Sequence, residues 1–343
     1  MSDSFRSAMT DAARLIRGGD LQRATAAIQA ALAASGAHPS AAANASNFKA
    51  DAPLPGMARA APTPDDDVRF TAGTHREASG QRDYKLFVPA GHGGRPLPLV
   101  VMLHGCTQDP DDFARGTRMN EAASELGFIV LYPAQAQQAN PSRCWNWFKH
   151  NHQERGRGEP QVIAGMTRDV MKRHDVDARR VYVAGLSAGG AMAAILGDAY
   201  PDLYAAIGVH SGLPAKCARD LPGALEAMRS GAATASRAPL PPTIVFHGDQ
   251  DTVVHPANAD RMLAASTWAT RDDDCAVSAN GRRYTRACLR DAQGRVVAEH
   301  WLVHGAGHAW SGGDARGSYT DPKGPDATAQ LVRFFLANPR AVG

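Results

Sequence analysis

Hydrophobic residues from about position 68 onward follow two alternating patterns. Short apolar runs rich in β-branched residues predict buried strands, and stretches with an apolar residue every three to four positions predict amphipathic helices. The runs that predict strands are 70–76, 84–88, 99–103, 128–132, 180–184, 205–209, 243–246 and 300–303. The stretches that predict helices are 111–126, 162–174, 191–199, 256–270 and 326–336. We expect the first two strands to pair antiparallel. The alternation that follows predicts right-handed βαβ units, and therefore an α/β fold whose mostly parallel central sheet is flanked by helices.

The first 67 residues differ in character. Residues 1–33 carry apolar residues at helical spacing, interrupted at Gly18, Gly19 and Asp20, which predicts an appendage of two short helices. Residues 34–67 are rich in Ala and Pro without periodicity, so we expect a linker there, followed by one α/β domain over 68–343. We expect the appendage to pack on its own domain or on a second copy. Docking on a partner or an apolar surface is the alternative.

Composition narrows the class of protein. Hydrophobic residues make up 44% and charged residues 21% of the 343 residues, as in soluble globular proteins. The net charge of +3, without a block of Lys and Arg, gives no reason to expect a nucleic-acid partner. No apolar run approaches the roughly 20 residues that span a bilayer. The first 17 residues lack a basic segment followed by an apolar core, so a cytoplasmic location is expected.

The chain has five cysteines, at positions 106, 144, 217, 275 and 288. An odd number without an export signal favours mainly reduced thiols. Cys275 and Cys288 flank a hairpin-like segment, and Cys106 and Cys144 both lie in loops of the predicted active face, so either pair could form a disulfide. There is no C-x-x-C pattern, and we expect neither a metal nor a cofactor.

The stretch 181–192 is the most informative in the chain. A buried strand leads into Gly185-Leu186-Ser187-Ala188-Gly189, and a helical pattern follows. This strand–turn–helix with the motif G-x-S-x-G is a nucleophile elbow, in which a serine hydroxyl projects from a tight turn beside the free N–H groups of a helix start. Glycines on both sides let neighbouring backbone pass closely. Ser187 is therefore the candidate nucleophile, although a Gly-rich turn can contain a serine by chance.

Other polar residues follow other predicted strands. His104-Gly105-Cys106 follows the strand at 99–103, His247-Gly248-Asp249-Gln250-Asp251 follows the strand at 243–246, and His304 to Trp310 follows the strand at 300–303. Function in such sheets collects at the carboxyl ends of the strands. The order Ser, Asp, His along the chain is that of α/β-hydrolases.

Acyl-transfer chemistry assigns the roles. His308 is the candidate general base, because the Gly305-Ala306-Gly307 segment before it gives its loop freedom to present the ring. The competing histidines His210, His247 and His304 are expected to be hydrogen-bonded loop residues. Asp251 is preferred over Asp249 as the carboxylate that orients the base, since Asp249 directly follows Gly248 in a tight turn and is expected to cap its own loop.

An oxyanion needs preorganised N–H donors. Ala188, after the nucleophile, and Cys106, after His104-Gly105, are the candidates for these backbone donors. Cys106 as an independent nucleophile is the less favoured alternative. Trp310 is expected to touch substrate. Trp145 and Trp147 either line an acyl or alcohol pocket or pack to hold a long loop in place.

These motifs, together with Cys144-Trp145-Asn146-Trp147 and Ser318-Tyr319-Thr320-Asp321-Pro322, resemble those of the polyhydroxybutyrate depolymerase family of esterases over about residues 68–340. The resemblance implies an α/β-hydrolase that cleaves short-chain polyhydroxyalkanoate esters without a cofactor. It implies Ser187, Asp251 and His308 as the triad, Cys106 and Ala188 as oxyanion donors, and Trp310 at the substrate. It also makes an extracellular location the alternative to the cytoplasm.

The sequence therefore predicts a serine esterase acting on polymer or oligomers of 3-hydroxybutyrate through an acyl-enzyme. The family also includes feruloyl, acetylxylan and general carboxylesterases, which remain alternatives. A non-catalytic scaffolding or granule-binding protein, whose N-terminal helices dock on a granule surface, is a second alternative. A complete triad argues against it, because a vestigial core has no reason to keep all three residues.

Overall fold

The computed structural model describes residues 49–50, 69–77, 80–90, 94–236, 238–264 and 266–341. The helices predicted within 1–33 lie outside these residues, as does the linker predicted at 34–67 apart from residues 49–50. The strands are β1 Lys49–Ala50, β2 Arg69–Glu77, β3 Gly80–Val88, β4 Leu97–Leu103, β5 Ile129–Pro133, β6 Val176–Leu186, β7 Ala206–His210, β8 Thr243–Gly248, β9 Thr270–Val277, β10 Arg283–Arg290, β11 Val296–Val303, β12 Trp310–Ser311 and β13 Thr320–Asp321. The helices are α3 Pro110–Thr117, α4 Met119–Leu126, the short 3₁₀ helix η1 His150–His152, α5 Gly158–Arg173, α6 Ala188–Ala199, α7 Leu221–Ser230, α8 Ala257–Leu263 and α9 Ala327–Ala337.

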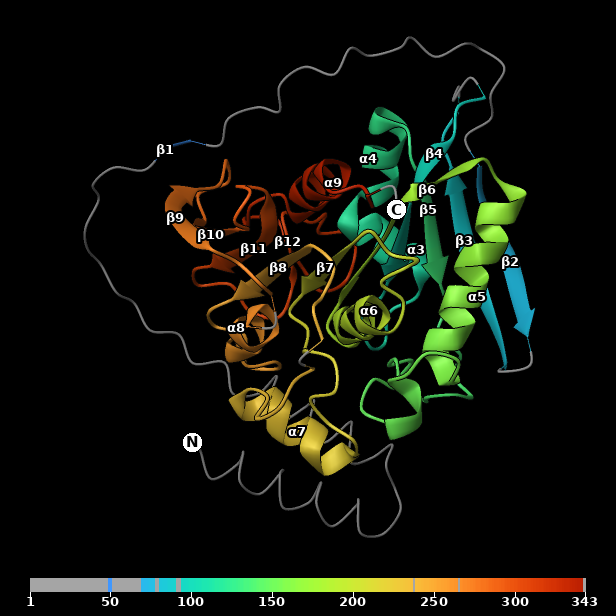
Figure 1. The fold of residues 1–343 in the computed structure, drawn as a ribbon, viewed down its shortest axis with the longest axis horizontal. Coiled ribbons are helices and arrows are strands. Elements are labelled where there is room, and N and C mark those ends of the chain that lie inside the picture. Colours follow the sequence, from blue (N-terminus) through green and yellow to red (C-terminus); the bar gives the residue numbers. More distant parts are fainter. Residues whose placement is uncertain are drawn as a thin grey trace. The chain divides into compact units, whose positions relative to one another are not determined.

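One large sheet organises the described part of the chain (Figure 1). Its strand order is β1-β9-β10-β11-β8-β7-β6-β4-β5-β3-β2. The strands from β11 to β5 in this order all run parallel, whereas β2, β3, β9 and β10 add antiparallel pairings at the two sides. The predicted antiparallel opening pair and the mostly parallel α/β sheet are confirmed.

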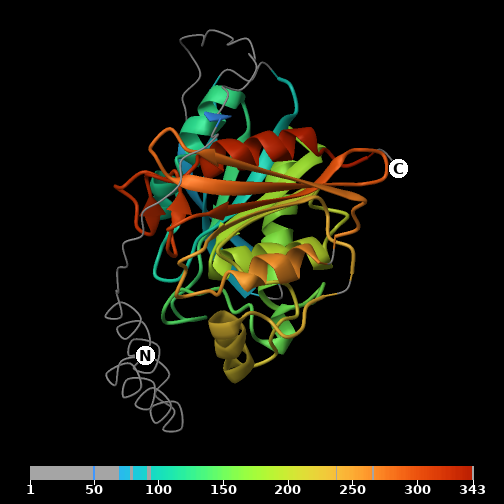
Figure 2. The same ribbon diagram turned by 90° about the vertical axis from the view of Figure 1, so that its left-hand side faces the viewer.

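The strand β4 shows how the layers form. All seven of its residues are buried, because the sheet is covered on both faces. Leu99 and Val101 pack in one apolar cluster with residues of α5 and α6, while Val100 and Met102, which point the other way, pack in another with residues of α3, α4 and α9. Figure 2 shows α9 (red) on one side of the sheet and α8 (orange) on the other.

The helix predicted at 111–126 is two helices. Arg118 has a φ of 56°, in the left-handed region, and separates α3 from α4. The carbonyl groups just before it are used elsewhere: Gly116 accepts a hydrogen bond from the N–H of Asp314, and Thr117 accepts one from the Thr328 hydroxyl. Tertiary contacts thus take carbonyls that a continuous helix would use itself.

Other predicted boundaries also move. The helix predicted at 256–270 ends at Leu263, and the chain then forms β9 and β10, which were expected only as a hairpin-like segment between Cys275 and Cys288. The helix α7 was not predicted, although Asp220 caps it by accepting from the N–H of Gly223 and a proline stands in its first turn. All predicted strands are present within a few residues of their expected limits.

Candidate active site

Ser187 lies at the turn between β6 and α6. Its φ of 58° is in the region that residues other than glycine rarely adopt, and its N–H donates to the carbonyl of His210 on β7 (2.9 Å). Such a conformation costs free energy and is held here by the surrounding structure. The side chain is only partly covered. This is the geometry of a nucleophile elbow.

The flanking glycines are required by close approach. A Cβ at Gly189 would lie 2.0 Å from the Leu103 carbonyl oxygen, and one at Gly185 would lie 2.4 Å from the carbonyl carbon of Gly189. The elbow is therefore pressed against the carboxyl end of β4. Any side chain at either position would push the serine out of place.

Asp251 and His308 form a hydrogen-bonded pair. The distance from Asp251 Oδ2 to His308 Nδ1 is 2.7 Å, and the Asp251 side chain is fully buried. The other oxygen, Oδ1, accepts from the N–H groups of Val253 and Val254 (2.9 Å each). Burial alone would raise the pKa of Asp251, but the imidazoles of His308 and His247 hold it well below its ordinary value. Asp251 is thus an ionised carboxylate that fixes the orientation of the His308 ring.

A buried histidine connects the two halves of the site. The backbone carbonyl of His210 accepts a hydrogen bond from the N–H of Ser187. The ring nitrogen Nε2 of His210 accepts one from the N–H of Ser311 (2.9 Å), which lies three residues after His308. Burial lowers the pKa of His210 from 6.5 to about 3, so its ring is neutral and able to accept. The serine turn and the loop carrying His308 are therefore tied to the same residue at the end of β7.

The turn formed by residues 104–107, the oxyanion turn below, lies beside the elbow. A Cβ at Gly105 would be 3.7 Å from the Ser187 Cβ. The Gly105 N–H donates to the side chain of Gln108 (2.9 Å), which leaves the next residue, Cys106, as the candidate donor of the turn. Ala188 is the first residue of α6, where N–H groups have no partner within the helix. The structure thus brings both candidate donors next to Ser187.

Cys106 is bonded to Cys144 in a disulfide. The expectation of mainly reduced thiols is wrong for this pair, and Cys106 has no free thiol to act as a nucleophile. Cys275 and Cys288 are both free, as is Cys217. Cys275 lies opposite Thr285 in the β9–β10 ladder rather than opposite Cys288, so the hairpin does not bring the two sulfurs together.

The three candidate substrate-binding tryptophans are buried. Trp310 is 1% exposed, stacks on His210 and donates from Nε1 to Thr328 (3.1 Å). Trp145 is fully buried and donates to the His104 carbonyl (3.1 Å), and Trp147 packs edge-on against Phe148. For Trp145 and Trp147 these contacts support the packing alternative, and in this conformation none of the three indoles offers a ligand much surface. Substrate contact by any of them stays a prediction.

The competing residues have other partners. Asp249 Oδ2 lies 3.0 Å from His304 Nδ1, and its Oδ1 accepts from the Gly305 N–H, so this carboxylate joins its loop to the next one, and the expectation that it caps its own loop is wrong. His247 is buried and donates from Nε2 to the Val254 carbonyl (2.8 Å). His104 is buried as well, which lowers its pKa to about 4. His210, His247 and His304 are hydrogen-bonded as expected, but His210 and His247 lie at the ends of β7 and β8 rather than in loops.

Two residues near the elbow had no role in the sequence analysis. Gln108 is 2% exposed and links the oxyanion turn to the 318 loop by donating to the Ser318 carbonyl (3.1 Å). Tyr319 is 45% exposed, and its hydroxyl is 3.1 Å from that of Thr107. An exposed aromatic ring beside the oxyanion turn is a further candidate for substrate contact. Its motif was visible in the sequence, but its position beside Thr107 was not.

The described residues contain no group of three or more His, Cys, Asp or Glu side chains that could hold a metal ion. Within the same ranges, no helix is long and apolar enough to cross a bilayer. A hollow of about 420 Å³ lies at the start of α5, lined by Arg82, Asn151, His152, Arg157, Gly158, Glu159 and Val162. None of the predicted catalytic residues lines it.

Solved structures confirm the fold. The chain is similar to an acetyl xylan esterase from Aspergillus awamori with a TM-score of 0.57 and 18% identity, over 75% of this chain and 94% of that one. At this level of identity the likeness concerns the fold alone. Together with the sheet order and the elbow, it shows that the described domain has the α/β-hydrolase fold.

Curated relatives include esterases and a depolymerase. The chain is 31% identical over 236 residues to poly(3-hydroxyalkanoate) depolymerase C of Paucimonas lemoignei, covering 64% of this chain and 56% of that protein. It is 27% identical to a probable acetylxylan esterase A of Neosartorya fischeri (59% and 61% covered) and 29% identical to feruloyl esterase B of Thermothelomyces thermophilus (52% and 67% covered). The chain thus matches a little over half the length of the first two relatives.

The sequence profile described as esterase PHB depolymerase matches residues 82–287, which is more than half of the chain. The matched range contains Ser187, Cys106 and Asp251 and ends before His308. On this evidence the chain belongs to the esterase PHB depolymerase family.

Proposed function

We propose that this protein is a serine esterase that hydrolyses carboxylic esters through an acyl-enzyme, with short-chain polyhydroxyalkanoate polymer or oligomers of 3-hydroxybutyrate as substrate. The observation that carries the proposal is the largely buried 2.7 Å pair of Asp251 and His308, in which the loop carrying His308 is tied through His210 to the strained turn of Ser187. The similarity to poly(3-hydroxyalkanoate) depolymerase C supports the choice of substrate.

In the proposed reaction, Ser187 Oγ attacks the ester carbonyl carbon while His308 Nε2 takes its proton. The negative charge on the carbonyl oxygen is stabilised by the N–H groups of Cys106 and Ala188. Asp251, ionised and hydrogen-bonded at Nδ1, stabilises the imidazolium. His308 then returns the proton to the leaving alcohol, and the acyl group remains on Ser187. Water attacks the acyl-enzyme by the same steps and releases the acid.

The nucleophile is tested by Ser187→Ala. We expect the hydrolysis of p-nitrophenyl butyrate to fall by about 10³-fold or more, with an unchanged thermal midpoint, because the variant removes only the attacking oxygen. Near-normal turnover by a folded variant would contradict the proposed mechanism. Wild-type activity no higher than the background rate would instead favour the alternative of a non-catalytic scaffolding protein.

A second candidate substrate class consists of acetylated or feruloylated polysaccharide. It is favoured by the acetylxylan esterase and feruloyl esterase relatives. Comparing kcat/KM on 3-hydroxybutyrate trimers, methyl ferulate and acetylated xylan separates the classes. A preference for either of the latter substrates by 100-fold would replace the polyester proposal while retaining the esterase mechanism.

The proposal also concerns the compartment in which the protein works. A structural disulfide such as Cys106–Cys144 is typical of oxidising environments. It therefore weighs towards the extracellular alternative and against the predicted cytoplasmic location. Peptide mass mapping of the native protein, with and without reduction, tests whether the bond is present where the protein works.

A further inference from the structure

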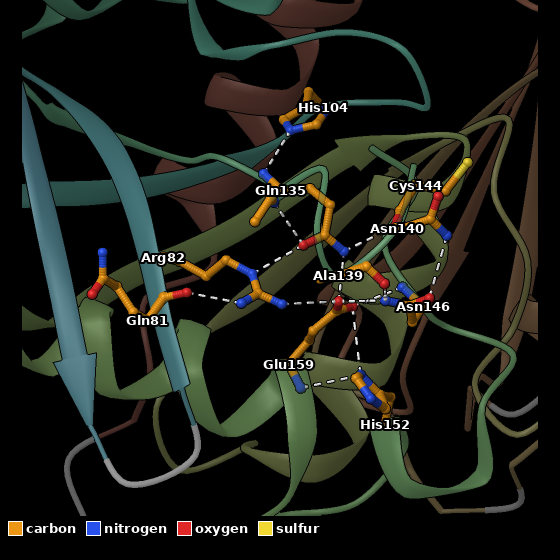
Figure 3. A network of polar contacts seen from close by, with 11 residues as sticks. Gln81, Arg82, His104, Gln135, Ala139, Asn140, Cys144, Asn146, His152 and Glu159 are labelled. Carbon is orange, nitrogen blue, oxygen red and sulfur yellow. Dashed lines mark hydrogen bonds and ion pairs between the residues drawn. The ribbon is translucent and has the colours of Figure 1, made fainter. Parts of the chain in front are cut away.

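A buried carboxylate outside the proposed triad lies at the centre of a polar network. Glu159, in the first turn of α5, has a side chain that is 1% exposed. Its Oε1 accepts from the side-chain amides of Gln135 (2.5 Å) and Asn146 (2.7 Å), and its Oε2 accepts from the backbone N–H of Asn146 (2.7 Å). Arg82 lies 3.3 Å away as the counter-ion. Figure 3 shows these groups converging on the carboxylate.

The network keeps this carboxylate charged. Burial alone would raise the pKa of Glu159, but the neighbouring His152 and the hydrogen bonds from Gln135 and Asn146 outweigh it, and the pKa lies below its ordinary value. A buried carboxylate that accepts several hydrogen bonds beside an arginine holds its partners more firmly than a neutral acceptor does.

The partners of Glu159 lie at both ends of one loop segment, residues 135–146. The side-chain NH₂ group of Gln135 also donates to the Cys144 carbonyl (2.9 Å). The side-chain amide oxygen of Gln135 accepts from Arg82 Nε (2.9 Å). Asn146 donates from the same amide nitrogen to the Ala139 carbonyl (3.3 Å). Glu159 thus joins the start and the end of the segment.

The same segment holds the oxyanion turn. The Gln135 N–H donates to His104 Nε2 (3.1 Å), and Trp145 Nε1 donates to the His104 carbonyl (3.1 Å). Cys144 is bonded covalently to Cys106, and the Ser142 carbonyl accepts from the Thr107 N–H (2.7 Å). Each of these links starts from the segment that Glu159 organises and ends on the turn that carries the candidate oxyanion donor.

We propose that Glu159 is a positioning residue for the oxyanion turn: its carboxylate sets the place of the Cys106 N–H through residues 135–146. The inference rests on the proposed function, because the position of this N–H matters only if Cys106 donates to the oxyanion. Donors act well only within a narrow range of distances from the oxyanion, so a small displacement weakens stabilisation of the transition state more than substrate binding.

The test is Glu159→Gln, which keeps the size of the side chain but replaces one accepting oxygen with an NH₂ group that faces donors. We expect kcat for p-nitrophenyl butyrate, per active site titrated with a phosphonate ester, to fall about 10- to 100-fold, since losing one oxyanion donor outright costs about 10²- to 10³-fold. We expect KM to change less than threefold. The inhibition constant of butylboronic acid, which places a charged oxygen near the donors, should rise with the loss in kcat.

Glu299→Gln is the matched control. Glu299 on β11 is similarly buried (2% exposed), accepts from an indole N–H (Trp301, 3.0 Å) and pairs with an arginine (Arg333, 2.6 Å). The same substitution there should lower the thermal midpoint but leave kcat per titrated site within twofold of the wild type. A purely structural role for Glu159 would give the same result at both positions, and that outcome would overturn the inference.

If Glu159→Gln yields no folded protein, Arg82→Lys takes its place. Lysine keeps the charge but loses the Nε bond to Gln135, so a two- to fivefold loss in kcat at constant KM is expected, and an unchanged kcat would count against the inference. Ser187→Ala separates the two levels of the proposal. If that variant remains active, the proposed function fails; if it is inactive while Glu159→Gln turns over normally, only the role of Glu159 fails.

Discussion

Two histidine–aspartate pairs connect the same two loops of this protein. The aspartates are two residues apart on the loop after β8, and the histidines are four residues apart on the loop after β11. Asp251 and His308 are 2.7 Å apart, with side chains that are 0% and 10% exposed, whereas Asp249 and His304 are 3.0 Å apart and about 30% exposed. The two pairs have the same chemistry. They differ in burial and in the groups to which they are attached.

Local geometry explains the difference. Asp249 directly follows β8, and its N–H still pairs with the Val303 carbonyl at the end of β11, so its side chain reaches His304 and Gly305 beside the strand ends. Asp251 comes after a turn and accepts from two N–H groups of its own loop, which turns the carboxylate into the interior. His304 Nε2 is already 2.8 Å from the hydroxyl of Thr285. We therefore expect the exposed pair to fasten the loops and the buried pair to carry the chemistry.

The largest expected effect comes from exchanging the two histidines for alanine, one at a time. His308→Ala should reduce kcat/KM on p-nitrophenyl butyrate by about 10⁴-fold, because the serine loses its base. His304→Ala should reduce it by less than about fivefold. Initial rates of both purified variants at pH 8 check the comparison, and a larger loss in His304→Ala would reverse the assignment.

Replacing the carboxylates sharpens the comparison. Asp251→Asn places an amide NH₂ against His308 Nδ1 and favours the wrong tautomer, so kcat should fall by about 10²- to 10⁴-fold. Asp249→Asn leaves an oxygen that can still accept from Gly305, and kcat should change by less than about threefold. The ratio of the two losses, measured on one ester, is the quantity to determine. A ratio near one would mean that both pairs serve only to hold the loops.

The sequence predicted the parts of the fold that follow from burial. Stretches such as 99–103 and 181–184 are apolar because both faces of the sheet are covered there, and the structure has strands where the pattern predicts them. The strand β9 carries no such signal, since most of its residues are exposed. Ion pairs join β9 to β10, Arg286 with Asp274 and Arg290 with Asp272. These pairs depend on the register between the two strands, which the residue pattern of β9 alone does not reveal.

In the candidate site too, features that depend on local sequence were predicted, and features that depend on tertiary contacts were not. Choosing Asp251 and His308 from sequence depended on local features, a tight turn and a Gly-rich approach, and the structure places these two side chains in contact. Their catalytic roles remain predictions. The Cys106–Cys144 bond could not be chosen from sequence, because it depends on two loops meeting with their Cα atoms 4.2 Å apart. The burial of Trp310 behind His210 was equally invisible, since it depends on packing against α9 and β7.

In contrast to His304 and His308, the ring of His210 is hydrogen-bonded to Ser211 and Ser311, and no carboxylate of the described residues pairs with it. The ring of His210 is buried and neutral, with a pKa of about 3 in the folded protein, whereas an unfolded chain binds a proton below about pH 6.5. Between these values the unfolded state carries more protons, so the free energy of unfolding should fall as the pH is lowered, by about 1.4 kcal/mol per pH unit from this residue.

His210→Gln removes this contribution. At pH 7 the variant should be less stable by about 1–3 kcal/mol, because the bond to the Ser311 N–H and the stacking on Trp310 are weakened. At pH 4.5 the difference from the wild type should shrink or change sign, since glutamine takes up no proton on unfolding. Urea unfolding of both proteins at the two pH values measures this. A stability difference that does not depend on pH would mean that His210 takes up a proton as readily in the folded state as in the unfolded state, and that the loop carrying His308 is not held by an accepting Nε2 that resists protonation.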